Sequence, residues 1–192
     1  MKRSGESAQI NLRSQFLAVF IRHIFISGLA VVFGIGAFWW FLTQKTYNIL
    51  YSCIFTCIYF GMMYSKCSRI AAHDLKGYAE TKSYPLKGIV LVLPVILLTL
   101  ALDILRLIMW KYMSDGTRLT GIPAVLSNAA FIMWTFPFNG IMAVHESAVS
   151  LAGRIALYGI PLISAFSGYF AGYKRFSLIE KLIPFMYEDK KK

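Results

Sequence analysis

Residues 24–42 limit how this chain can fold more than any other feature, because nineteen consecutive positions carry no ionisable side chain. A helix needs about 20 predominantly apolar residues to cross the roughly 30 Å hydrocarbon core of a bilayer. The stretch ends in the cluster Phe38-Trp39-Trp40-Phe41, and Trp is enriched at the headgroup level of membranes. These features predict a first transmembrane helix over residues 24–42. The mixed stretch over residues 12–23 either lies along the interface or extends this helix, with Arg22 reaching the headgroups.

Three further apolar runs of similar length follow, over residues 49–65, 88–110 and 153–173. In lipid the backbone must satisfy its own hydrogen bonds, which leaves helices and closed barrels as spanning structures. Barrel strands alternate apolar and polar residues, whereas these runs are continuous. The charged fraction is 15%, against about 25% in soluble domains. We therefore predict an all-α, polytopic integral membrane bundle that forms a single membrane domain over residues 1–192.

The ambiguous part of the chain is residues 122–144, which are apolar enough to span but contain several helix-breaking and polar residues. Phe136 to Gly140, read as Phe-Pro-Phe-Asn-Gly, predict a break in the helix. In one interpretation this outer segment is re-entrant or interfacial, which gives four transmembrane helices. In the other it is a full crossing, which gives five.

The distribution of basic residues favours four spans, because short cytoplasmic loops are enriched in Lys and Arg. With four spans and both termini inside, fifteen of the 20 Lys and Arg residues are cytoplasmic and five are outside. With five spans the split becomes ten to ten. We therefore expect cytoplasmic N- and C-termini, a cytoplasmic loop over residues 66–87 and a basic cytoplasmic tail over residues 174–192. The chain size and basic tails suggest the plasma membrane of a bacterium.

Small residues recur at four-residue spacing on the second and last predicted spans, where they would let helices approach closely. They are Cys53, Cys57, Gly61 and Ser65, and then Ser164, Gly168 and Gly172. We expect these stripes to pack the bundle internally; the alternative is that one of them docks a partner subunit. The cysteine pair lacks the further ligands that a metal site needs, so we assign it to packing.

Ionisable groups inside a span are costly and by default suggest function. Asp103 and Arg106 are three residues apart, close enough to pair on one helix face. We expect a structural ion pair in which Arg106 extends outward to the headgroups. Other candidate polar residues lie in the broken segment or near the outer end of the last span: Asn128, Asn139, His145, Glu146 and Arg154.

A ligand pocket, if the protein has one, should lie between residues 122–144 and the outer half of the third span; the alternative is a lid that plugs the outer face. His73 and Asp74 follow the second span in the hydrophilic loop. We interpret them as a solvated pair, because no nucleophile lies at a telling distance from them.

No nucleotide-binding motif is present in the sequence, and we expect no cofactor or metal. The net charge of +11 is concentrated at the ends of the apolar runs, where anionic headgroups attract basic side chains. We therefore expect the lipid bilayer as a partner and no nucleic acid.

The sequence favours a non-enzymatic membrane subunit or accessory protein that packs with another membrane protein or with itself. An alternative is a small transporter or channel that uses Asp103, Arg106 and the broken segment. A third hypothesis is an intramembrane enzyme that uses His145 and Glu146.

Overall fold

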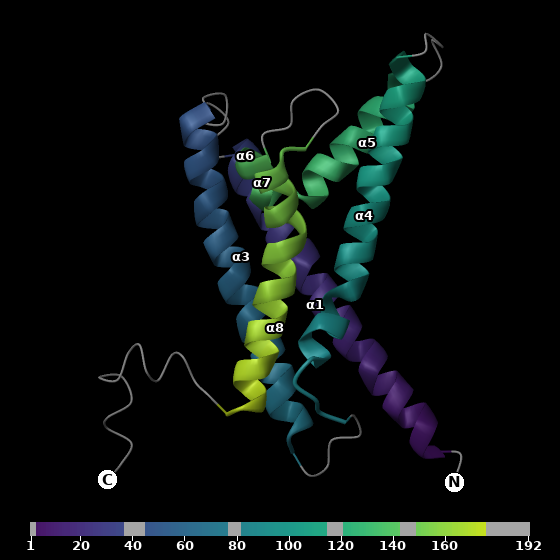
Figure 1. The fold of residues 1–192 in the computed structure, drawn as a ribbon, viewed down its shortest axis with the longest axis vertical. Coiled ribbons are helices and arrows are strands. Elements are labelled where there is room, and N and C mark those ends of the chain that lie inside the picture. The colour runs from purple at the N-terminus through teal and green to yellow at the C-terminus, as the bar shows by residue number, and fades with distance from the viewer. Residues whose placement is uncertain (1–2, 37–44, 77–81, 115–120, 143–148, 176–192) are drawn as a thin grey trace.

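The computed structural model describes residues 3–36, 45–76, 82–114, 121–142 and 149–175, and every regular element in them is helical. Four helical stretches are long and apolar enough to cross a membrane: Leu12–Gly34, Thr46–Asp74, Lys87–Lys111 and Leu151–Tyr173. They belong to α1 (Arg3–Gly36), α3 (Lys45–Asp74), α4 (Lys87–Ser114) and the run of α7 (Leu151–Arg154), η3 (Ile155–Gly159) and α8 (Ile160–Tyr173). The predicted bundle of four candidate membrane-spanning helices is confirmed (Figure 1).

The first span begins before residue 24, so the stretch over residues 12–23 extends the first helix, as in one of the two alternatives. α1 is continuous from Arg3 to Gly36 and its span is Leu12–Gly34, while residues 37–42 lie outside the described residues. His23 is only 1% exposed, because its ring contacts Tyr59 and Trp134 on other helices. A polar side chain with partners inside the bundle therefore lies within the first span.

The predicted loop over residues 66–87 is also shorter than expected, because α3 continues to Asp74 and α4 begins at Lys87. Cys67, Ile70 and Ala71 are buried at helical spacing on the extended part of α3. This buried face stabilises the two additional turns by packing, although the composition around it is hydrophilic.

The broken apolar segment consists of α5 (Gly121–Trp134), η2 (Phe136–Phe138) and α6 (Asn139–Met142). Its two halves meet at an angle of 78°. The carbonyl of Met142 accepts hydrogen bonds from the amide and the hydroxyl of Ser150, at 3.2 and 2.8 Å. The end of α6 therefore lies beside the start of α7, and both α5 and α6 occupy the end of the bundle where α4 ends (Figure 1). The segment is therefore a bent helix pair at one end of the bundle.

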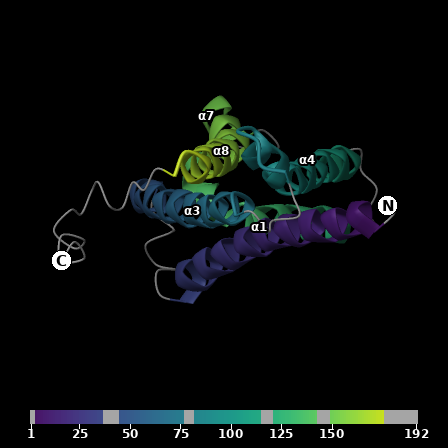
Figure 2. The ribbon, with the colours of Figure 1, turned by 90° about the horizontal axis from the view of Figure 1, so that it is seen from below.

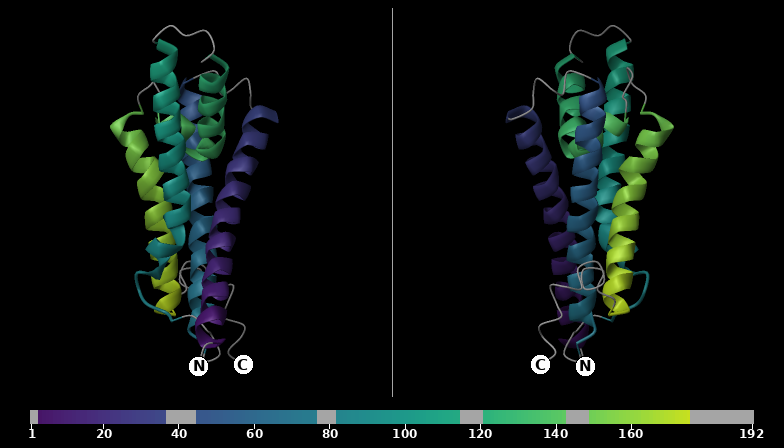
Figure 3. Two further views of the ribbon diagram at one scale, coloured as in Figure 1. Left: turned by 90° about the vertical axis from the view of Figure 1, so that its right-hand side faces the viewer. Right: turned by 90° about the vertical axis from the view of Figure 1, so that its left-hand side faces the viewer.

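α8 packs closely on α3, as Figure 2 shows from below. A Cβ atom at Gly168 would come within 2.7 Å of the Tyr64 Cα atom, and one at Gly172 within 2.8 Å of the Ala71 Cβ atom. Ser164 is fully buried on α8. The small-residue stripe of the last span thus lets two helix backbones approach. α1 begins and α8 ends at the same end of the bundle (Figure 3).

Candidate functional site

Four helices converge on the carboxylate of Asp74, which is only 6% exposed. Its Oδ2 atom lies 2.5 Å from Lys87 Nζ and accepts a hydrogen bond from the Tyr169 hydroxyl at 2.9 Å. Its Oδ1 atom accepts a hydrogen bond from Gln15 Nε2 at 2.7 Å. We call these four residues the Asp74 network; it joins α1, α3, α4 and α8.

The Asp74 network overturns the interpretation of His73 and Asp74 as a solvated pair. His73 is exposed, but Asp74 is turned into the bundle. One signal in the sequence pointed to this outcome: Asp74 continues the three- and four-residue spacing of the buried face that includes Ile70 and Ala71. A carboxylate on an apolar helix face needs a partner, and Lys87 lies at the start of the next helix.

A second polar cluster surrounds His23 and joins α1, α3, α4 and α5. Its Nδ1 atom lies 2.9 Å from the Tyr59 hydroxyl, and its ring centroid is 4.2 Å from that of Trp134. Trp134 Nε1 donates to the Thr99 hydroxyl at 2.8 Å, and Ser27 donates to the Trp134 carbonyl at 2.9 Å. Sequence reasoning missed this cluster, because it depends on contacts between distant segments. Its hydrogen bonds hold α5 against α1 and α4, and they connect α1 with α3.

The predicted pairing of Asp103 with Arg106 is confirmed, with Arg106 Nη2 2.8 Å from Asp103 Oδ1. The expectation that Arg106 extends outward is wrong. This residue is 3% exposed, and its guanidinium lies 4.7 Å from the centroid of the Phe131 ring. The physical reason is that α5 packs on α4 and covers this face of the helix.

The other predicted polar residues do not assemble with this pair in the described part of the chain. Asn128 and Asn139 are half-buried, Arg154 is exposed, and no side-chain hydrogen bond or ion pair links them to Asp103 or Arg106 within the described ranges. His145, Glu146 and the tail residues 176–192 lie outside the described residues. The site between α4 and the broken segment is therefore a packed contact that contains one ion pair.

The polar clusters are separated by apolar core. Leu91, Val92 and Val95 are all at most 1% exposed and lie on α4 between Lys87 and Thr99. Lys87 and Thr99 are twelve residues apart, which corresponds to about 18 Å along a helix. The clusters therefore do not form one continuous polar path along α4.

The small-residue stripe on α3 faces outward, contrary to the expectation that it packs the bundle internally. Cys53, Cys57 and Gly61 are exposed, Ser65 is half-buried, and nothing lies within 4 Å of a Cβ atom built at Gly61. The reason is the rotation of α3, which presents Tyr64 and Ser68 to the glycines of α8. This exposed stripe is available to a neighbour.

Comparison with known proteins adds no likeness: no protein-family model, curated protein or solved structure matches the chain. Among the described residues, no group of three or more His, Cys, Asp or Glu side chains could hold a metal ion.

Proposed function

We propose that this chain is a non-enzymatic membrane subunit or accessory protein that binds a transmembrane helix of a partner through the outer face of α3. The observation that carries the proposal is the exposed stripe of Cys53, Cys57 and Gly61. Lipid tails are as apolar as leucine, so membrane helices associate where small residues permit close approach. The stripe offers such an approach along two turns of α3.

The surroundings of the stripe support this role. Ile54 and Ile58 are exposed beside it, so large side chains flank a row of small ones, as in helix packing by ridges and grooves. Only 22% of the residues in the apolar window of α3 are buried, against 50% in the window that contains α8. α3 therefore has the larger share of surface left for a neighbour.

The same spacing is already used inside the bundle, where Gly168 and Gly172 of α8 pack on α3. The partner can be a second membrane protein or a second copy of this chain. We further propose a bacterial plasma-membrane location with both termini in the cytoplasm, because that orientation leaves fifteen of the 20 basic residues inside.

The alternative of a small transporter or channel has weaker support. Arg106 is engaged by Asp103 and by the Phe131 ring, and apolar core separates the polar clusters on α4. A solute pathway would require both the contacts of Arg106 and the apolar core along α4 to rearrange. Flux in liposomes that is abolished by Asp103→Asn and by Arg106→Gln, with the bundle still folded, would favour transport instead.

The test of the subunit proposal is the mass and composition of the tagged protein after purification in a gentle detergent at native expression. We expect a second polypeptide, or a second copy, at fixed stoichiometry. Gly61→Leu should remove it while the bundle stays folded, because the new side chain fills the approach surface. Gly28→Leu is the matched control, since Gly28 of α1 is also exposed with nothing within 4 Å of its built Cβ atom.

Three outcomes would contradict the proposal. A wild-type protein that is monomeric and carries no second polypeptide would contradict the subunit proposal directly. Retention of the complex by Gly61→Leu, or equal loss in Gly61→Leu and Gly28→Leu, would show that the outer face of α3 is not the docking surface.

A further inference from the structure

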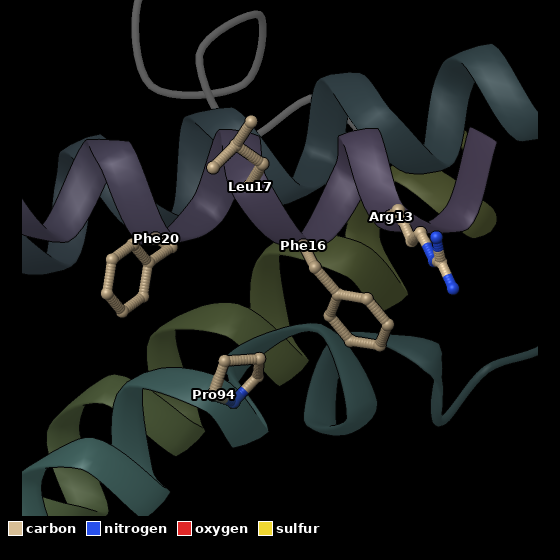
Figure 4. A pocket seen from close by; sticks show the side chains of 5 residues that line it. All are labelled: Arg13, Phe16, Leu17, Phe20 and Pro94. Carbon is tan, nitrogen blue, oxygen red and sulfur yellow. The ribbon is translucent and has the colours of Figure 1, made fainter. Parts of the chain in front are cut away.

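An open groove of about 270 Å³ lies between α1 and α4. Arg13, Phe16, Leu17 and Phe20 line it from α1, and Pro94 lines it from α4 (Figure 4). The four α1 residues recur at three- and four-residue spacing, which puts them on one side of the helix. In Figure 4 the Phe16 ring points toward α4, and Arg13 stands at one end of the row. The groove is thus apolar along its length and cationic at one end.

The two parts of the groove lie at different depths along the span. Arg13 is the second residue of the span that begins at Leu12, so its guanidinium is at the edge of the apolar stretch. Phe20 is seven residues further, about 10 Å along the helix axis. Leu17 is 57% exposed, which leaves the groove open at the side of the bundle. A phospholipid has the same order, because its charged headgroup lies at the edge of the bilayer and its acyl chains lie deeper.

We propose that this groove binds an anionic glycerophospholipid of the surrounding bilayer, with its phosphate on Arg13 and one acyl chain along Phe16, Phe20 and Pro94. A guanidinium donates two parallel hydrogen bonds to phosphate oxygens. Basic pockets between transmembrane helices are a recurrent form of anionic headgroup site. The aromatic rings and the proline ring supply a firm apolar wall for the chain.

The charge at one end of the groove favours a phospholipid over an apolar protein helix, because Arg13 offers a partner to a phosphate group. The site is also separate from the exposed stripe on α3, because its lining residues lie on α1 and α4. Its occupancy can therefore be tested independently of partner binding.

Trp134 provides a reporter, because its ring centroid lies 5.6 Å from that of the groove residue Phe20. The experiment uses the full chain with Trp39→Phe, Trp40→Phe and Trp110→Phe, so that Trp134 is the single tryptophan. The protein is reconstituted in phosphatidylcholine vesicles that contain an equal fraction of either brominated phosphatidylglycerol or brominated phosphatidylcholine. Quenching of Trp134 fluorescence then reports which brominated chain occupies the groove.

We expect the relative association constant for phosphatidylglycerol to exceed that for phosphatidylcholine about fivefold, as for one basic residue at the membrane surface. Arg13→Gln should reduce this ratio to about one, and Arg13→Lys should retain part of it, since Lys keeps the charge but lacks the planar fork. Arg69→Gln is the matched control, because Arg69 is an exposed arginine on α3 and does not line the groove.

Equal quenching by the two lipids in the single-tryptophan protein that keeps Arg13 would overturn the proposal. This comparison between lipids does not depend on the folding of any Arg13 variant. Equal losses in Arg13→Gln and Arg69→Gln would also overturn the proposal, because the preference would then come from the general surface charge. Absence of quenching by both brominated lipids would overturn it as well, because no acyl chain would then lie beside Phe20 and Trp134.

Discussion

Asp74 and Asp103 each hold a basic side chain inside the bundle, but the two ion pairs differ in the number of helices that they join. Asp74, at the end of α3, binds groups from α1, α4 and α8. Asp103 forms its ion pair with Arg106 on the same helix, three residues later, and its carboxylate also interacts with the Tyr158 side chain of η3. Loss of the first pair would release contacts between four helices, whereas loss of the second would weaken the contacts of α4 with η3 and α5.

The two pairs also differ in burial. The side chain of Asp74 is 0% exposed and that of Asp103 is 12% exposed. Taking a charge out of water is costly, and only good geometry and additional hydrogen bonds compensate for it. Asp74 has that compensation from Lys87, Tyr169 and Gln15. The ion pair of Asp74 is therefore expected to contribute more to the stability of the bundle than the ion pair of Asp103.

The largest effect should come from Lys87→Met, which removes the cation from the fully buried Asp74 carboxylate. We expect the free energy of unfolding to fall by about 3–5 kcal/mol, the usual cost of breaking a buried pair from one side. Unfolding in mixed micelles with increasing sodium dodecyl sulfate, followed by circular dichroism, measures this change. Removing both charges with Asp74→Leu and Lys87→Met should cost less than removing Lys87 alone.

Lys82→Met is the control for this prediction, because Lys82 is exposed and its replacement should change stability by less than about 0.5 kcal/mol. If Lys87→Met costs no more than Lys82→Met, the Asp74 network does not join the helices energetically, and the comparison between the two pairs fails.

Arg106→Met should have an intermediate effect of about 2 kcal/mol, typical of a hydrogen bond to a charged group. The cost is smaller than at Lys87, because Asp103 is partly exposed and its partner lies on the same helix. The same unfolding titration measures it, and hydrogen exchange should increase in α5, which loses the contact between Arg106 and Phe131. Arg154→Met, at an exposed position, is the control. A cost equal to that of Lys87→Met would reverse the ranking.

Tyr169→Phe should have the smallest effect, about 1.5 kcal/mol, because it removes one hydrogen bond to the Asp74 carboxylate and leaves Lys87 and Gln15 in place. The measurement is the unfolding free energy relative to Tyr173→Phe, a half-buried tyrosine one turn later on α8. Indistinguishable values for the two variants would mean that the Tyr169 hydroxyl contributes nothing to the network.

Features that depend on local spacing could be predicted from the sequence. The apolar runs predicted four spans, residues 136–140 predicted the break, and the spacing of Asp103 and Arg106 predicted their pairing. The Asp74 network could not be predicted in the same way. Gln15 and Tyr169 are 59 and 95 residues from Asp74, and no local pattern relates them. The burial of His23 could not be predicted for the same reason, because the partners of its ring lie on other helices.

The sequence by itself determined that this protein is a helical membrane bundle, because bilayer thickness and backbone hydrogen bonding leave few structures for apolar runs of this length. Only the tertiary structure decided which small-residue stripe packs against another helix of the bundle. Gly168 and Gly61 stand in the same four-residue pattern, yet one packs against Tyr64 and the other has nothing beside it. The pattern defines a helix face, but the rotation of each helix about its axis is set by all of its neighbours together.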